Sequence, residues 1–238
     1  MKVVLVNILA IGAHPDDIEL GCGGLLIKCA SQGHHVNMYS VTRGAASGDP
    51  MQRTRELQES AKFIGAENLW IDNFEDTKLS VCDELINHIE YFINKARPDL
   101  ILTHSQGDTH HDHRAIALAT IEAGRYFSNI LAYEIPLTKV FSPQVFFDIS
   151  DVVDKKVRLI EIFWSQHSKL YLKANAIKGL AEYRALQSRL NTAIDHVEAF
   201  EVLKLCLNKD LALSQVPYAR LPRMSEPTID VQAVLQGT

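Results

Sequence analysis

Residues 7–24 read NILAIGAHPDDIELGCGG, and this stretch decides the fold class. Its first part is short and apolar, which is typical of a buried β-strand over Asn7–Ala13. Its last part predicts a helix over Ile18–Ser31, preceded by acidic residues that suit the positive end of the helix dipole. A buried strand that leads through a polar turn into a helix favours an α/β protein.

The same alternation of strand and helix continues along the chain. Pro98 suits the entry of a later strand, because proline would break a helix interior. Further strands are predicted at His35–Thr42, Asn68–Ile71, Asp99–Thr103, Asn129–Glu134 and Val145–Ile149. Helices are predicted at Met51–Ile64, Asp83–Ala96 and His113–Tyr126. This order predicts a Rossmann-like, doubly wound α/β fold, with a mostly parallel sheet and helices on both faces.

The C-terminal third is expected to be helical. Its predicted helices are Val152–Ser165, Leu170–Leu190 and Ala193–Leu205. The tail at 210–238 holds prolines and little periodicity, so it is expected to be an irregular extension. A length of 238 residues favours one domain over 1–238.

Composition narrows the function classes. The formal net charge is -5 and no basic run is present, so nucleic acid is not an expected partner. No apolar run approaches the ~20 residues of a membrane span. The four cysteines form no C-x-x-C pair, which argues against a thiolate zinc site and favours a reducing compartment, hence a cytoplasmic protein.

The N-terminus allows a second interpretation. Lys2 and the apolar run Val3–Gly12 resemble the start of a signal peptide. However, the run leads straight into the polar turn at His14, and no Ala-x-Ala cleavage site precedes that turn. We therefore expect a strand here.

Two polar clusters follow predicted strands. The first is HPDD at 14–17, after the first strand, and the second is DTHHDHR at 108–114, after the fourth. Alone, the first could be an ordinary helix cap and the second a solvated turn. In a doubly wound sheet of order 3-2-1-4-5, however, the first and fourth strands are neighbours, and ligands bind outside their carboxyl ends. The two clusters are therefore expected to meet.

Such a meeting would bring together imidazoles and carboxylates. Two imidazoles and one carboxylate are a common catalytic zinc set, which leaves a position open for a water. Zinc is favoured over magnesium because imidazoles outnumber carboxylates, although iron(II) uses the same kind of ligand set.

The two clusters also carry a family resemblance. Residues 13–24, AHPDDIELGCGG, resemble the signature of the LmbE-like, or PIG-L, family of zinc-dependent de-N-acetylases, and HHDH at 110–113 resembles its second signature. Further agreement lies in Arg53-x-x-Glu56, Tyr133-Glu134, Asp148-Ile149-Ser150, Lys156, Ser165-Gln166 and Glu198-Ala199-Phe200. The resemblance covers about residues 5–203.

The resemblance implies a function and roles for particular residues. The chain would hydrolyse the acetamide of an N-acetylated, N-acetylglucosamine-like sugar. A homo-oligomer is expected separately. The zinc ligands would be His14, Asp17 and His113. Asp16 would be the general base, and His110 a protonated electrostatic partner or acid. Asp112 would orient a neighbouring histidine, while Arg53 would contact the substrate or position the base.

Two positions depart from the family pattern, and both bear on the substrate. Ala45 stands where the family usually has Glu in the loop after the second strand. His196 stands where Tyr is frequent. Because imidazole can donate a hydrogen bond, His196 is a candidate for stabilising the oxyanion of the tetrahedral intermediate, and a surface histidine is the alternative.

Three other functions fit the same elements. A nucleotide-binding or transferase module would need no metal. A catalytically silent protein would bind zinc without hydrolysis. A metal-dependent phosphoesterase usually needs more carboxylates or two metals.

Overall fold

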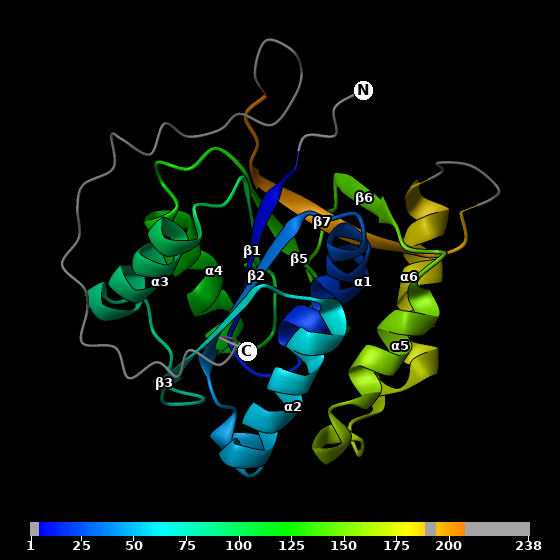
Figure 1. Ribbon diagram of the computed structural model, residues 1–238, viewed down its shortest axis with the longest axis horizontal. Coiled ribbons are helices and arrows are strands. Elements are labelled where there is room, and N and C mark those ends of the chain that lie inside the picture. Colours follow the sequence, from blue (N-terminus) through cyan, green and yellow to red (C-terminus); the bar gives the residue numbers. More distant parts are fainter. Residues whose placement is uncertain (1–4, 189–193, 208–238) are drawn as a thin grey trace.

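The computed structural model describes residues 5–188 and 194–207, which build one sheet between two layers of helices (Figure 1). The strands are β1 (Asn7–Gly12), β2 (His35–Thr42), β3 (Asn68–Phe74), β4 (Leu100–His104), β5 (Ile130–Tyr133), β6 (Val145–Asp148) and β7 (Val197–Lys204). The helices are α1 (Asp17–Ser31), α2 (Pro50–Ile64), α3 (Asp83–Ala96), α4 (His111–Ala123), α5 (Val153–Glu161) and α6 (Ala174–Ser188). Short 3-10 helices lie at Ala45–Ser47, Trp164–Gln166 and Leu170–Leu172.

The sheet is doubly wound, as predicted. Its strand order is β3-β2-β1-β4-β5-β7-β6. The pairs β1–β2, β2–β3, β1–β4 and β4–β5 are all parallel. The order reverses between β1 and β4, so the carboxyl ends of these two strands flank the switch point, where ligands bind in such sheets.

Helices cover both faces of the sheet, which explains why its central strands are mostly apolar. Figure 1 shows α3 and α4 on one side and α1, α2, α5 and α6 on the other. One core includes Leu26 of α1 and Leu57 of α2, and the other includes Phe92 of α3 and Ile116 of α4. A strand buried between two such cores loses contact with water on both faces.

The prediction of a helix at Ala193–Leu205 is wrong. Val197–Lys204 is a strand, β7, which pairs antiparallel with both β5 and β6. Alanine, leucine, lysine and glutamate suit a helix by propensity, but a strand here fills the gap between two strand edges. Tertiary pairing therefore overrides the local pattern.

Smaller differences concern the ends of helices. The fourth helix begins at His111, two residues before the predicted start, because His110 caps it by accepting from the backbone N–H of Asp112. The helix predicted at 152–165 ends at Glu161, and the one predicted at 170–190 begins at Ala174. The predicted extension at 210–238 lies outside the described residues, and one domain over 1–238 stays a prediction.

No helix in the described part of the chain combines the length and apolar character needed to cross a membrane. The cysteines at 22, 29, 82 and 206 are free thiols.

Candidate metal centre and active site

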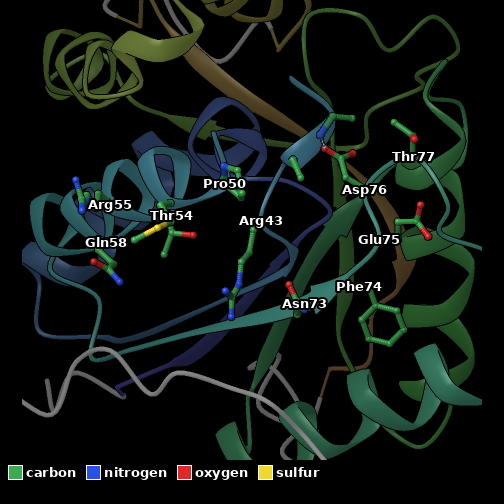
Figure 2. Close-up of a pocket in the computed structure, with 13 residues that line it drawn as sticks. Arg43, Pro50, Thr54, Arg55, Gln58, Asn73, Phe74, Glu75, Asp76 and Thr77 are labelled. Atoms are coloured by element: carbon green, nitrogen blue, oxygen red, sulfur yellow. Dashed lines mark hydrogen bonds between the residues drawn. The ribbon is translucent and has the colours of Figure 1, made fainter. Parts of the chain in front are cut away.

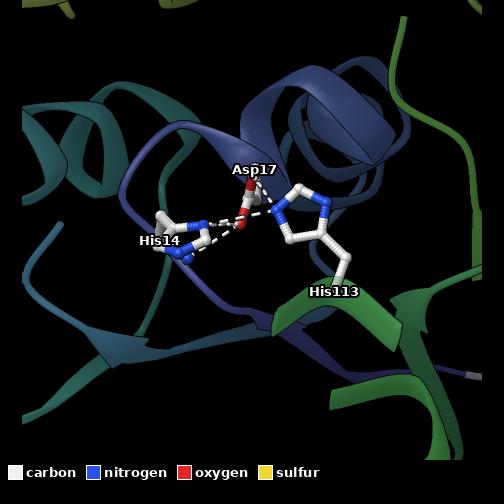
Figure 3. Close-up of side chains that lie close together, drawn as sticks. All are labelled: His14, Asp17 and His113. Carbon is white, nitrogen blue, oxygen red and sulfur yellow. Dashed lines mark hydrogen bonds and ion pairs between the residues drawn. The ribbon is translucent and has the colours of Figure 1, made fainter. Parts of the chain in front are cut away.

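Three side chains from the two polar clusters meet at the switch point. His14 lies in the turn after β1, Asp17 begins α1, and His113 lies in the first turn of α4. Figure 3 shows the two imidazoles and the carboxylate directed toward one another. All three residues are buried.

The three side chains offer ligand atoms that all lie within 4.8 Å of one another, and the two oxygens of Asp17 each approach one imidazole. His14 Nδ1 lies 3.2 Å from Asp17 Oδ2, and His113 Nε2 lies 3.3 Å from both His14 Nδ1 and Asp17 Oδ1. Two atoms that each bind one zinc ion at about 2.0–2.1 Å with tetrahedral angles stand about 3.3–3.4 Å apart. The spacing and the donor types therefore fit zinc.

Carboxylates surround the two imidazoles. His14 Nε2 lies 3.0 Å from Asp112 Oδ2 and 2.9 Å from Asp76 Oδ1. His113 Nδ1 lies 3.1 Å from Asp108 Oδ1, close enough for an ion pair but outside hydrogen-bond geometry. A carboxylate behind a histidine ligand fixes the orientation of its ring and raises its basicity.

A second group, His14, His110 and Asp112, also has ligand atoms within 4.8 Å of one another. It is less suited to a metal, because Asp112 accepts hydrogen bonds from the backbone N–H groups of Thr77 and Leu79 and contacts His14 Nε2. These contacts fit the orienting role predicted for Asp112.

The centre is rich in negative charge. Burial lowers the pKa of His113, but Asp17 and Asp108 outweigh it and raise that pKa to about 9. Burial likewise opposes protonation of His14, yet hydrogen bonds to Asp112 and Asp17 raise its pKa well above 6.5. The ligand histidines therefore carry protons that compensate the carboxylates, and a bound cation would replace them.

Asp16 lies beside the ligands but is held by other groups. Its carboxylate Oδ2 accepts a hydrogen bond from Arg53 Nη2 at 3.1 Å, and burial raises its pKa to about 6 against the opposing effect of Arg53. Arg53 also donates to the carbonyls of Pro15 and Gly44 and to the hydroxyl of Ser47. These contacts favour a positioning role for Arg53, the second of its two predicted roles.

His110 faces the same cavity. Its ring packs on His14 and His113, with centroids 4.9 and 4.7 Å away. Burial lowers its pKa, and so do His113 and His14. Since Nδ1 accepts from the backbone of Asp112, the proton of the neutral ring lies on Nε2. His110 is thus better suited to donate a hydrogen bond than to carry a charge.

His196 is not brought to the centre. It precedes β7, and its Nε2 lies 3.5 Å from Glu182 Oε1 on α6. It is not among the residues that line the cavity at the metal centre. His196 is half-buried beside α6, so neither the oxyanion role nor a surface position describes where the structure places it.

Three further residues lie at the centre, although no role at the site was predicted for them. Asp76 follows β3, outside both clusters. His104 ends β4, where its Nε2 accepts the backbone N–H of Ala13 and its ring stacks on His113. Asp108 is part of the second cluster, and its position shortly after a predicted strand could have indicated a place at the site.

A cavity of about 250 Å³ opens over the centre. Its floor holds the ligand residues and Asp16, and its rim includes Leu137, Lys169 and Tyr171. A buried floor with an open mouth allows a small polar group to reach the reacting side chains.

The chain belongs to the PIG-L family, described as GlcNAc-PI de-N-acetylase, which it matches over residues 9–124. It is similar to an uncharacterized deacetylase, YaiS, from Escherichia coli, with 36% identity over 61% of this chain and 83% of that protein. It is also similar to the diacetylchitobiose deacetylase of Thermococcus kodakarensis, with 28% identity over 67% of this chain and 70% of that protein. It is therefore a hydrolytic de-N-acetylase.

Solved structures agree on the fold. The conserved protein TT1542 from Thermus thermophilus superposes with a TM-score of 0.77, at 22% identity, over 88% of this chain and all of that one. GalB from Pseudomonas putida, a 4-carboxy-2-hydroxymuconate hydratase, gives 0.73 at 19% identity, over 86% of this chain and 99% of that one. The fold alone therefore does not select the reaction.

Proposed function

We propose that this protein uses zinc to hydrolyse the acetamide of an N-acetylated, N-acetylglucosamine-like sugar or sugar conjugate. The observation that supports this proposal best is the meeting of His14, Asp17 and His113 at the cavity, with 3.2–3.3 Å between the closest nitrogen and oxygen atoms of each pair. The Thermococcus relative, named for an N-acetylated disaccharide, supports the substrate class.

A zinc ion, when bound, acidifies a water and polarises a carbonyl. Asp16 takes a proton from the attacking water, whose oxygen bonds to the acetamide carbon. The C–N bond then breaks, the sugar nitrogen takes up the proton that Asp16 holds, and acetate leaves. Arg53 fixes the base, and Asp112 fixes the ring of His14. His110 donates a hydrogen bond to the developing oxyanion.

The direct test is amine release. The purified protein should be stripped with a chelator, reloaded with zinc or iron(II), and assayed on N-acetylglucosamine and N,N'-diacetylchitobiose. We expect release of a free amine with one bound metal ion per chain, and loss of both in His113→Ala. Tight zinc binding without amine release from any N-acetylated sugar would favour the catalytically silent alternative. A homo-oligomer stays a prediction.

A further inference from the structure

The cavity over the metal centre has two walls of opposite polarity. In the order of the sheet, β2 and β3 lie on one side of the central pair β1 and β4, and β5 lies on the other. The segments after β2 and β3 bring Ser47, Asp76 and Thr77 to one wall. The segment after β5 brings Ile135 and Leu137 to the other. The two walls are therefore suited to different parts of one substrate.

The polar wall is suited to a sugar. Ser47, Asp76 and Thr77 offer hydroxyl and carboxylate oxygens, which pair with sugar hydroxyl groups. A larger cavity of about 860 Å³ adjoins this wall, since Asp76 and Thr77 line it as well. Figure 2 shows further polar side chains around it, among them Gln58 and Asn73. A sugar on this side of the metal centre finds both partners and space.

The apolar wall runs from the floor of the cavity to its mouth. Leu20 and Ile135 belong to the hydrophobic core and are only 4% and 6% exposed, whereas Leu137 is 50% exposed. Tyr171 completes this wall at the mouth and packs against the same core. Exposed leucines are common on protein surfaces. This one, however, extends the apolar lining of a reaction cavity outward, where it can contact an apolar part of the substrate.

Both parts of the apolar wall are held in place by hydrogen bonds. The hydroxyl of Thr138, next to Leu137, donates to Asp108 Oδ2 at 2.7 Å. The hydroxyl of Ser165, on the segment that leads to the 3-10 helix at the mouth, donates to Glu56 Oε2 of α2 at 2.6 Å. A wall that is already ordered does not lose conformational entropy when a substrate binds.

The acyl group is the part of the substrate that matches the apolar wall. The amide carbon carries an oxygen, the sugar nitrogen and the acyl chain. With the sugar on the polar wall and the oxygen toward His110, the acyl chain faces the apolar wall. We infer that this wall binds the acyl chain and, because it stays open at the mouth, that the protein also hydrolyses N-acyl sugars with acyl groups longer than acetyl. Leu137 and Tyr171 are the specificity-determining residues. The inference rests on the proposed function, and the bonds formed and broken are the same, with a longer carboxylate as the product.

A series of acyl lengths tests the wall. We would compare the N-acetyl, N-butyryl and N-hexanoyl forms of glucosamine by amine release. A fully buried methylene is worth about fourfold in affinity, so a half-open wall should give about twofold for each. For the wild type, kcat/KM should therefore rise about fourfold from acetyl to butyryl. Leu137→Ser and Tyr171→Ser should each reduce this rise, and Leu137→Ser should leave kcat/KM for the acetyl form near that of the wild type.

Val140→Ser is the matched control. Val140 is 73% exposed on the same loop as Leu137 and is not among the residues that line the cavity, so the rise should persist in this variant. In the wild type, a kcat/KM for the butyryl form equal to or below that for the acetyl form would overturn the inference. An equal loss for both forms in Leu137→Ser would also overturn it, since the leucine would then serve the structure and not the acyl chain.

Binding without turnover separates this inference from the proposed function. Calorimetry on Asp16→Asn, which lacks the base, should show tighter binding of the butyryl form than of the acetyl form, and Leu137→Ser in that background should remove the difference. Tighter binding of the butyryl form without amine release from any N-acyl sugar by the wild type would overturn the proposed reaction and leave the apolar wall standing. Amine release from the acetyl form alone would do the reverse.

Discussion

Asp16 occupies a backbone conformation that few residues tolerate. Its φ is 102° and ψ -20°, in the left-handed region, at the point where β1 passes into α1. Its carboxylate makes no capping hydrogen bond to α1, and Arg53 holds it instead. Asp and Asn are the residues besides glycine that adopt positive φ most readily. The strained turn thus directs a carboxylate toward the cavity and away from the helix end.

Replacing Asp16 by Asn tests the base while keeping the turn. Asn suits positive φ and can still accept from Arg53, but it cannot accept the proton of water. We expect kcat to fall by about 10²–10⁴, with metal content and unfolding midpoint close to those of the wild type. Single-turnover amine release and elemental analysis measure the two quantities. A near-normal rate would assign proton transfer to another group.

Asp108 should act on the metal through His113. Asp108→Asn removes the negative charge 3.1 Å from His113 Nδ1 but keeps a side chain of the same size. The metal affinity should fall about 10- to 100-fold, as is typical when the partner of a histidine ligand is lost. Competition with a metal-chelating dye measures it. Asp151→Asn, on the exposed Asp151, is the matched control, and an equal loss there would contradict the assignment.

Individual residues also show how far the sequence predicts the site. His14, Asp17 and His113 are recognisable because each follows a strand at the switch point. Asp76 is not, because it follows β3 at the sheet edge and reaches His14 only through its loop. His196 is not brought to the centre, since a residue that takes a family position in sequence need not share its surroundings.

At the scale of elements, α1 is two helical segments joined at a break. Cys22 has φ -141° and ψ 17°, outside helical values. The backbone N–H groups of Gly24 and Leu25, freed by the break, donate to the carboxylate of Glu198 on β7, each at 2.7 Å. Lys156 Nζ on α5 lies 2.6 Å from the same carboxylate. One buried carboxylate therefore joins three elements behind the metal centre.

Glu198→Gln should destabilise the protein strongly. The amide keeps the size of the side chain but leaves the buried ammonium of Lys156 without a counter-charge. Breaking one partner of a buried pair costs about 3–5 kcal/mol, which urea unfolding measures. Removing Lys156 as well, in Glu198→Gln with Lys156→Met, should recover part of the loss. A loss below about 1 kcal/mol in the single variant, as expected of an exposed pair, would contradict this.

Elements differ in how well their sequence predicts them. The strands β1 to β4 are largely apolar and alternate with helices along the chain, and their predicted positions agree with the structure to within a few residues. β7 was missed because its identity depends on pairing with β5 and β6, which a local pattern does not contain. Its strand conformation is also what places Glu198 against the break in α1.

At the scale of the whole molecule, the fold concentrates carboxylates where the chain segments that follow β1, β3 and β4 converge. Asp17, Asp76, Asp108 and Asp112 come from three different loop regions, and each lies within 3.3 Å of an imidazole of His14 or His113. These carboxylates raise the pKa values of His14 and His113 and so favour positive charge at this place. The native state therefore holds a preformed cation site that the unfolded chain lacks, and metal binding must add to folding stability.

Zinc should consequently raise the melting temperature of the whole protein. A ligand at 100 times its dissociation constant stabilises the native state by about 2.7 kcal/mol. For a chain of this size, each kcal/mol shifts the melting temperature by about 2–4 °C, so a rise of about 5–10 °C is expected. Thermal unfolding followed by circular dichroism, with chelator-treated protein and increasing zinc, measures it.

Magnesium should give little shift, since two of the three ligands are imidazoles. His113→Ala should abolish the shift because it removes a ligand while leaving the fold in place. An equal rise in that variant would mean that zinc acts elsewhere on the protein.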